Sequence, residues 1–148
     1  MSILREQRAI RLNEVIEAAI EAGDHYEEEA TRIGDDRLAR LFVDLARRRR
    51  EMSETMSTHI IRLGDLPFEP DVEAELIHEM ASKLRAMTED SRRVLLEERI
   101  EAEAELQSRI GAALATDLPT DTLGLLEQYR EDTKAAQVQL REMLTYFS

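Results

Sequence analysis

Hydrophobic side chains recur every three or four residues along four long stretches of the chain, the period of a helix that buries one face. None of these stretches shows the strict alternation that a half-buried strand requires. The pattern predicts helices over residues 2–33, 36–63, 71–114 and 121–147. We expect the third to bend or restart between Thr88 and Ser91. The predicted fold class is all-α.

Glycines and prolines interrupt the pattern where helices should end. Gly34 with the two aspartates after it is typical of a helix end followed by a new N-cap. Further breaks lie at residues 64–70 and 117–121. The short first and third loops place successive helices antiparallel, whereas the longer second connection leaves up-down-up-down and crossover topologies open. We expect one antiparallel four-helix bundle, a single domain over residues 1–148.

Each predicted hydrophobic stripe has a small or polar residue near its middle. These residues are Gly23 in the first helix, an arginine of the run 47–50 in the second, Glu103 in the third, and Arg130, Thr133 and Gln137 in the fourth. Successive helical residues are rotated by about 100°, so one arginine of the run must face the bundle. The spacing from Leu45 to Met52 favours Arg49 over Arg48, and Glu103 is its predicted partner because an unpaired buried charge is costly. The alternative is that these side chains all reach solvent at the surface.

Residues 12–26, 41–49 and 94–103, with His78 ahead of the last, resemble the ferritin-like superfamily of the rubrerythrin and bacterioferritin type. They resemble more closely a small bacterial ferritin-like family of unknown function built from two helical hairpins. The resemblance implies a ferritin-like bundle with a di-iron position at mid-height.

Such di-iron sites take one Glu from each of two helices and a Glu-x-x-His pair from each of the others. The resemblance places these ligand positions at Gly23, Glu103, Arg49 with Met52, and Lys134 with Gln137. Only Glu103 keeps the chemistry of a ligand. The resemblance therefore implies a degenerate site without a metal cofactor, in which Arg49, Glu103 and Lys134 form a buried ion network.

A second hypothesis keeps iron as the cofactor. Glu75 and His78 form the one Glu-x-x-His in the sequence and would share a helix face, although two ligands are few and a solvated acidic face is the alternative. Glu51 and Glu54 would turn inward if the alignment with the family shifted by one helical turn. In that case the protein would bind iron, or act in oxidative stress, through an unorthodox carboxylate and histidine site.

Composition limits the classes of partner that we expect this protein to bind. The formal net charge of −12 repels phosphate backbones, and 4% aromatic residues without tryptophan offer few base-stacking platforms, so we expect no nucleic-acid binding. The absence of cysteine excludes disulfides and thiolate chemistry. Since no window is apolar enough to span a bilayer, we expect no membrane insertion and a cytoplasmic protein.

The sequence favours a non-enzymatic structural or interaction module, stress-related in one interpretation. We expect it to form a homo-oligomer or to bind a partner protein through an exposed apolar seam. The candidate seam residues are Ile20, Leu76, Ile77, Met80 and Leu84. A third hypothesis is an adaptor or sensor that recognises another protein through the first part of the third helix.

Overall fold

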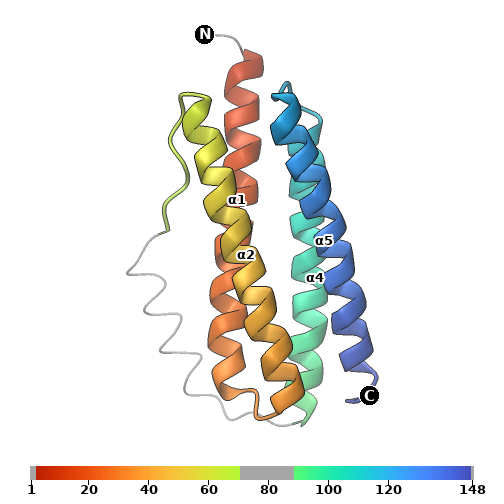
Figure 1. The fold of residues 1–148 in the computed structure, drawn as a ribbon. Coiled ribbons are helices and arrows are strands. Elements are labelled where there is room, and N and C mark those ends of the chain that lie inside the picture. Colours follow the sequence, from red (N-terminus) through yellow and green to blue (C-terminus); the bar gives the residue numbers. More distant parts are fainter. Residues whose placement is uncertain (1–2, 71–88, 148) are drawn as a thin grey trace.

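The computed structural model describes residues 3–70 and 89–147, and every regular element in them is helical. The helices are α1 (Ile3–Arg32), α2 (Asp36–Arg62), α4 (Glu89–Leu114) and α5 (Thr120–Leu144), packed side by side as Figure 1 shows. Their bounds agree closely with the prediction, and the all-α four-helix bundle is confirmed. Residues 71–88 of the predicted third helix lie outside the described part, which resumes within a helix at Glu89, so the bend or restart expected between Thr88 and Ser91 stays a prediction.

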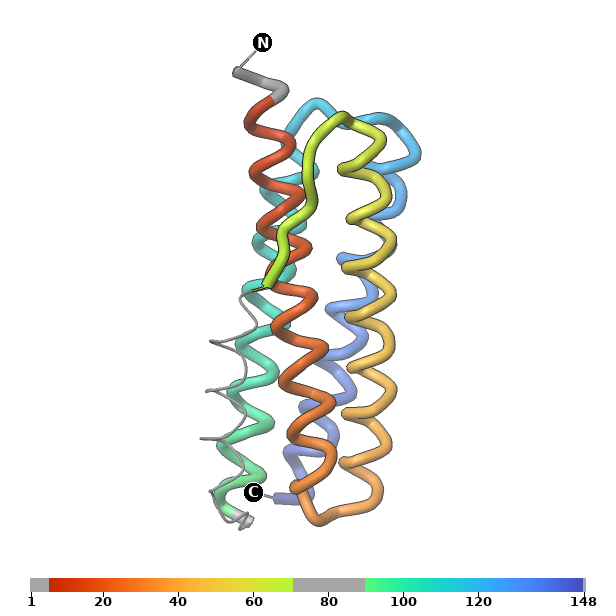
Figure 2. The backbone as a smooth tube through the Cα atoms, turned by 90° about the vertical axis from the view of Figure 1, so that its left-hand side faces the viewer, coloured from red at the N-terminus to blue at the C-terminus, as the bar shows by residue number. Residues whose placement is uncertain are grey.

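The bundle consists of two antiparallel hairpins, α1 with α2 and α4 with α5. Both Figure 1 and Figure 2 show α2 and α4 running in the same direction. α1 packs against α2 and α4, and α5 packs against α4 and, less closely, against α2. Neighbouring helices are therefore antiparallel and the parallel pairs lie on the diagonals. Of the two topologies left open by the sequence, the structure has the crossover.

The turn between α1 and α2 is fixed by local chemistry and by a contact from α4. Gly34 has φ +70°, in the left-handed region that glycine enters without steric cost. The side chain of Asp35 caps α2 by accepting a hydrogen bond from the backbone N–H of Leu38 at 2.9 Å. Arg92 Nε donates to the carbonyl of Ile33 at 2.6 Å, which ties this turn to the start of the second hairpin.

Polar contacts also join the elements at the opposite end of the bundle. Asn13 of α1 donates from Nδ2 to the carbonyl of Leu66 at 3.0 Å and accepts from the N–H of Phe68 at 2.6 Å. These two bonds hold residues 64–70 against α1. Arg62 at the end of α2 pairs with Asp121 at the start of α5 at 2.7 Å.

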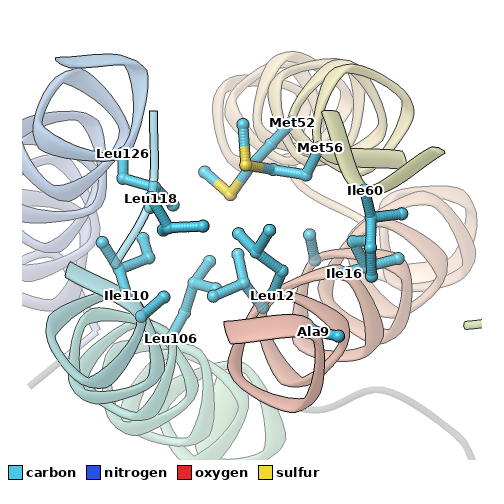
Figure 3. Packing of buried hydrophobic residues seen from close by; sticks show 13 residues of the cluster. Ala9, Leu12, Ile16, Met52, Met56, Ile60, Leu106, Ile110, Leu118 and Leu126 are labelled. Atoms are coloured by element: carbon cyan, nitrogen blue, oxygen red, sulfur yellow. The ribbon is translucent and has the colours of Figure 1, made fainter. Parts of the chain in front are cut away.

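Buried hydrophobic side chains form two clusters rather than one continuous core. The first surrounds the first half of α1, and in Figure 3 Leu12, Met52 and Leu106 reach from α1, α2 and α4 into a common space. The second surrounds the second half of α1 and includes Phe42 of α2 and Leu140 of α5. Each fully buried Leu or Met contributes about 1.5–3 kcal/mol of transfer free energy. What separates the clusters is polar.

Candidate functional site

Polar side chains from all four helices lie where the two hydrophobic clusters meet. The buried ones include Tyr26 of α1, Arg49 of α2, Glu103 of α4, and Thr133 and Gln137 of α5. Charged residues are rare in protein interiors, because removing an ion from water costs several kcal/mol unless it is paired and hydrogen-bonded. The layer is therefore the place where this bundle departs from simple hydrophobic packing.

Arg49 and Glu103 form an ion pair across the diagonal of the bundle, and both side chains are 0% exposed. Arg49 Nε donates to Oε1 and Oε2 of Glu103, at 3.1 Å each. Arg49 Nη2 also donates to Oε1. The structure thus brings together the two residues that the sequence pairs, and of the four consecutive arginines it is Arg49 that faces inward.

Tyr26 completes the shell of Glu103. Its hydroxyl donates to Oε2 of Glu103 at 3.2 Å, and its ring packs edge-on against Phe42 at 5.1 Å between centroids. Burial, together with the adjacent charge of Glu103, raises the pKa of Tyr26 well above its usual value. The phenol therefore stays protonated and acts as a permanent donor.

Asp132 of α5 is a second carboxylate partner of Arg49. Its Oδ2 lies 2.6 Å from Nη1 of Arg49. Its side chain is 32% exposed, and its other oxygen pairs with Arg48 Nη2 at 2.8 Å. Arg48 in turn donates to Asp44 at 3.1 Å and to Gln139 at 3.0 Å. The network thus begins at the buried centre and ends at solvent between α2 and α5, the neighbouring helices that approach least closely.

Lys134 does not belong to this network, contrary to the prediction. Its side chain is 52% exposed and pairs with Glu131 on the surface at 3.1 Å. Thr133 faces the interior, and the next residue of a helix is turned away by about 100°. Asp132 contributes to the layer instead, with the opposite charge.

The electrostatics of the network favour its ionised form. Burial alone would lower the pKa of Arg49, but the carboxylates of Glu103 and Asp132 outweigh that effect and raise it above the usual guanidinium value. Burial would raise the pKa of Asp132, but the hydrogen bonds and charges of Arg49 and Arg48 outweigh it and lower that pKa. Arg49 therefore remains a cation, and Asp132 an anion, throughout the neutral range.

A second buried ion pair joins α1 to α4, and the sequence analysis missed it. Arg99 Nε lies 3.4 Å from Oε1 of Glu29, and the side chains are 9% and 4% exposed. His25 Nδ1 lies 3.6 Å from the other oxygen of Glu29. A signal was present in the sequence, because Arg99 follows Leu96 by three residues and precedes Glu103 by four, the spacing of an inward stripe.

The other positions implied by the resemblance do not converge on Glu103. A Cβ atom on Gly23 would lie 3.3 Å from Cγ of Arg50, so this position faces α2 and permits a close approach of the two helices. Met52 packs in the first hydrophobic cluster. Gln137 is buried and donates to the carbonyl of Ile100 at 3.1 Å.

The structure gives little support to the alternative carboxylate and histidine site. Glu51 and Glu54 are exposed and do not turn inward, because Met52 and Ser53 take the inward positions of that turn. Glu75 and His78 lie outside the described residues. Within residues 3–70 and 89–147, no three histidine, aspartate or glutamate side chains gather closely enough to hold a metal ion.

The residues at the centre of the layer do not fit a di-iron centre. Both oxygens of Glu103 already accept hydrogen bonds from Arg49, so a divalent cation on this carboxylate would stand beside a fixed positive charge. Iron in such bundles is bound by several carboxylates and two imidazoles. Among the described residues the hydrogen-bond partners of Glu103 are Arg49 and Tyr26, which are neither. What the arrangement can do is hold three helices in one register through directional, charge-assisted bonds.

Of the five residues of the predicted apolar seam, Ile20 lies in the described part of the chain. Ile20 is partly buried and packs against the first hydrophobic cluster. The other four candidate seam residues fall in residues 71–88, outside the described part. The seam itself therefore stays a prediction.

Comparisons with known proteins give a family but no activity. No described helix is long and apolar enough to cross a membrane. Neither a curated protein nor a solved structure matches the chain. One family profile, a domain of unknown function (DUF2383), matches residues 8–116, which include Arg49 and Glu103 but not Asp132. Since this match spans more than half of the 148 residues, the chain belongs to the DUF2383 family.

Proposed function

We propose that this protein is a non-enzymatic, metal-free bundle of the ferritin-like type that serves as a structural or interaction module. Two arguments from the fold support the ferritin-like part of the proposal. A crossover connects the two hairpins, so that α2 and α4 run in the same direction (Figure 2), and ferritin-like bundles have a connection of this kind. A polar layer crosses the core at mid-height, where bundles of that type bind their irons.

The single observation that carries the proposal is the burial of the Arg49 guanidinium against Glu103, both 0% exposed. A guanidinium is a fixed cation with hydrogen-bond donors in a planar fork. It can neutralise a buried carboxylate as a metal ion would, but it cannot be lost, exchanged or oxidised. The layer would then keep the architecture of a metal site without its chemistry.

The bonding within the layer also favours a structural role over catalysis. Arg49 and Tyr26 both donate to Glu103, and all three side chains are fully buried, so a substrate could not reach them without opening the bundle. Each of these bonds requires one relative position of the helices that it joins. The layer would thus specify the alignment of α1, α2 and α4, while the outer faces of the helices remain available to a partner.

The test is metal binding by the whole chain. The protein is purified without chelator and offered ferrous iron in air, and bound iron and consumed oxygen are measured. We expect clearly less than one iron per chain and no oxygen consumption above that of buffer. Stoichiometric iron or rapid oxygen consumption would overturn the proposal.

Two variants locate any iron that does bind. Loss of iron in Glu103→Gln would assign it to the central layer and contradict the metal-free interpretation. Loss in His78→Ala with retention in Glu103→Gln would assign it to the Glu75 and His78 pair, and the iron-binding hypothesis would replace ours.

A further inference from the structure

The outer face of α2 carries two adjoining hollows with an exposed valine between them. The larger, of about 700 Å³, lies between α1 and α2, and the smaller, of about 510 Å³, lies further toward the start of α2. Val43 lines both and is 60% exposed. Ala30 and Ala46 also line the larger hollow, so it contains apolar surface next to the exposed side chain of Val43.

The charged residues on this face of α2 are arranged symmetrically with opposite signs. Three pairs lie at equal distances on either side of the peptide bond between Leu45 and Ala46. The pairs are Arg37 with Glu54, Arg40 with Glu51, and Asp44 with Arg47. Their helical spacing of three and four residues keeps all six on one side of α2. Every pair joins a basic to an acidic residue, so this face is complementary to a copy of itself turned end over end.

Only part of the pattern stabilises α2 itself. Arg47 pairs with Asp44 at 2.9 Å and with Glu51 at 3.4 Å, at the spacings that favour a helix. Arg37 and Arg40 lie in the first turns of α2, where the helix dipole disfavours positive charge. Arg47 and Glu51 are 65% and 67% exposed, and contacts within the chain leave most of each side chain in water. Exposed pairs of this kind contribute little to the stability of the fold. Their arrangement therefore suits a surface that meets another surface.

We propose that this face is a docking site for a second copy of the chain. The two α2 helices lie antiparallel about a two-fold axis that passes near Leu45 and Ala46. Arg40 of each copy then faces Glu51 of the other, and Val43 of each copy fills the hollow lined by Ala30 of the other. In such an isologous contact every attractive pair occurs twice, once on each side of the two-fold axis. This inference rests on the proposed role as an interaction module and names its partner.

The size of the face matches that of a stable dimer. α2 has 27 residues and is about 40 Å long at about 1.5 Å per residue. With the adjoining strip of α1, a face about 20 Å wide offers about 800 Å² per copy, the area that a specific interface of standard size buries on each partner.

The test begins with the mass of the wild-type chain in solution, by light scattering during size-exclusion chromatography and by sedimentation over a range of concentrations. We expect a dimer at about 100 μM. Arg40→Glu puts two glutamates opposite each other at both symmetric contacts, and Glu51→Arg puts two arginines there. Each single variant should dissociate about a hundredfold more readily than the wild type. Both sites are exposed, so the fold should survive.

A mixture of the two variants gives the decisive measurement. In a mixed dimer, Glu at position 40 of one chain meets Arg at position 51 of the other, and the reverse contact is attractive as well. We expect the mixture to recover the dimer that neither variant forms alone. Val43→Asp, which would remove the apolar side chain that packs against Ala30 and Ala46 of the other copy, should also weaken the dimer. The control Lys134→Glu, an exposed charge reversal on α5, should leave the dimer unchanged.

A wild-type monomer at about 100 μM overturns this inference, and so does a dimer that all the α2 variants leave intact. An equal loss in the Lys134→Glu control would show a general charge effect and overturn it too. None of these results bears on metal binding. Iron in the central layer would refute the proposed function whatever the oligomeric state.

Discussion

Replacing Arg49 with methionine removes a buried cation while keeping much of the side-chain volume. The wild-type guanidinium makes three hydrogen bonds to Glu103 and one to Asp132. Asp132 would retain Arg48 and contact with solvent, whereas Glu103 would keep the Tyr26 hydroxyl and stay away from water. The cost of the substitution is therefore essentially that of an unpaired buried carboxylate.

Two estimates of this cost agree. Removing one member of a buried ion pair destabilises proteins by about 3–5 kcal/mol. Glu103 could instead take up a proton on folding, and protonating a glutamate of ordinary acidity at pH 7 costs about 4 kcal/mol. We expect the free energy of unfolding of Arg49→Met to be lower by about 4 kcal/mol. At a slope of about 2 kcal/mol per molar urea, the unfolding midpoint measured by circular dichroism falls by about 2 M.

Matched variants separate burial from charge. Arg48→Met removes the neighbouring arginine, whose side chain is 16% exposed and whose carboxylate partners remain hydrated, and should cost less than about 1 kcal/mol. Arg49→Met combined with Glu103→Gln leaves no stranded charge and should recover most of the lost stability.

The pH dependence of the stability of Arg49→Met gives an independent test. In Arg49→Met the folded state should bind a proton at Glu103 more tightly than the unfolded state does, so the variant loses stability as pH rises. Between pH 7 and pH 5 the gap to the wild type should therefore narrow, by up to about 3 kcal/mol. A single variant that costs less than about 1 kcal/mol, or a double variant no more stable than the single, would refute the reasoning.

Two further predictions concern the turn before α2 and the solvent side of the network. Gly34→Ala should lower the free energy of unfolding by about 1–2 kcal/mol, because φ is +70° and the new Cβ would lie 2.8 Å from Arg92 Nη2. Gly124→Ala, inside α5 with nothing within 4 Å of the Cβ position, should raise it by about 0.5–1 kcal/mol. A higher thermal midpoint in Gly34→Ala would contradict the first expectation, and a lower one in Gly124→Ala the second. The pKa of Asp132 is lower in the folded state, so its carboxylate stabilises the fold above its unfolded pKa, near 4, and this contribution is lost as pH falls through the folded value. As pH falls, the free energy of unfolding should therefore decrease more steeply for the wild type than for Asp132→Asn. Equal slopes of this free energy against pH below about pH 4 would count against the pairing with Arg49.

Local rules were enough to predict most of the described helices. The three-and-four spacing of hydrophobic residues is a property of each segment alone, and the cap at Asp35 needs no partner beyond its own helix. Arg49 could be predicted for a related reason, since four consecutive arginines sweep the helix circumference and one must face inward. Glu103 then followed from its height along the third helix.

The features that the sequence left open or missed depend on which helices are neighbours. Short loops fix each hairpin but not the direction of the second hairpin relative to the first, so the crossover appears only in the folded bundle. Asp132 lies one residue from Thr133 at the edge of the inward stripe, where the position of the facing helix decides whether a side chain reaches the layer. The pairing of Glu29 with Arg99 exists because α1 packs against α4.

The sequence by itself thus determined the helices, their inward faces and the presence of a charged residue in the core. The tertiary structure alone decided that Asp132 is the second partner of that charge, which path leads from it to solvent, and which charged face of α2 is left outside. The physical reason is one of range. The helical period acts over one or two turns, whereas an ion pair across the bundle joins residues 54 positions apart, whose approach depends on the packing of every helix between them.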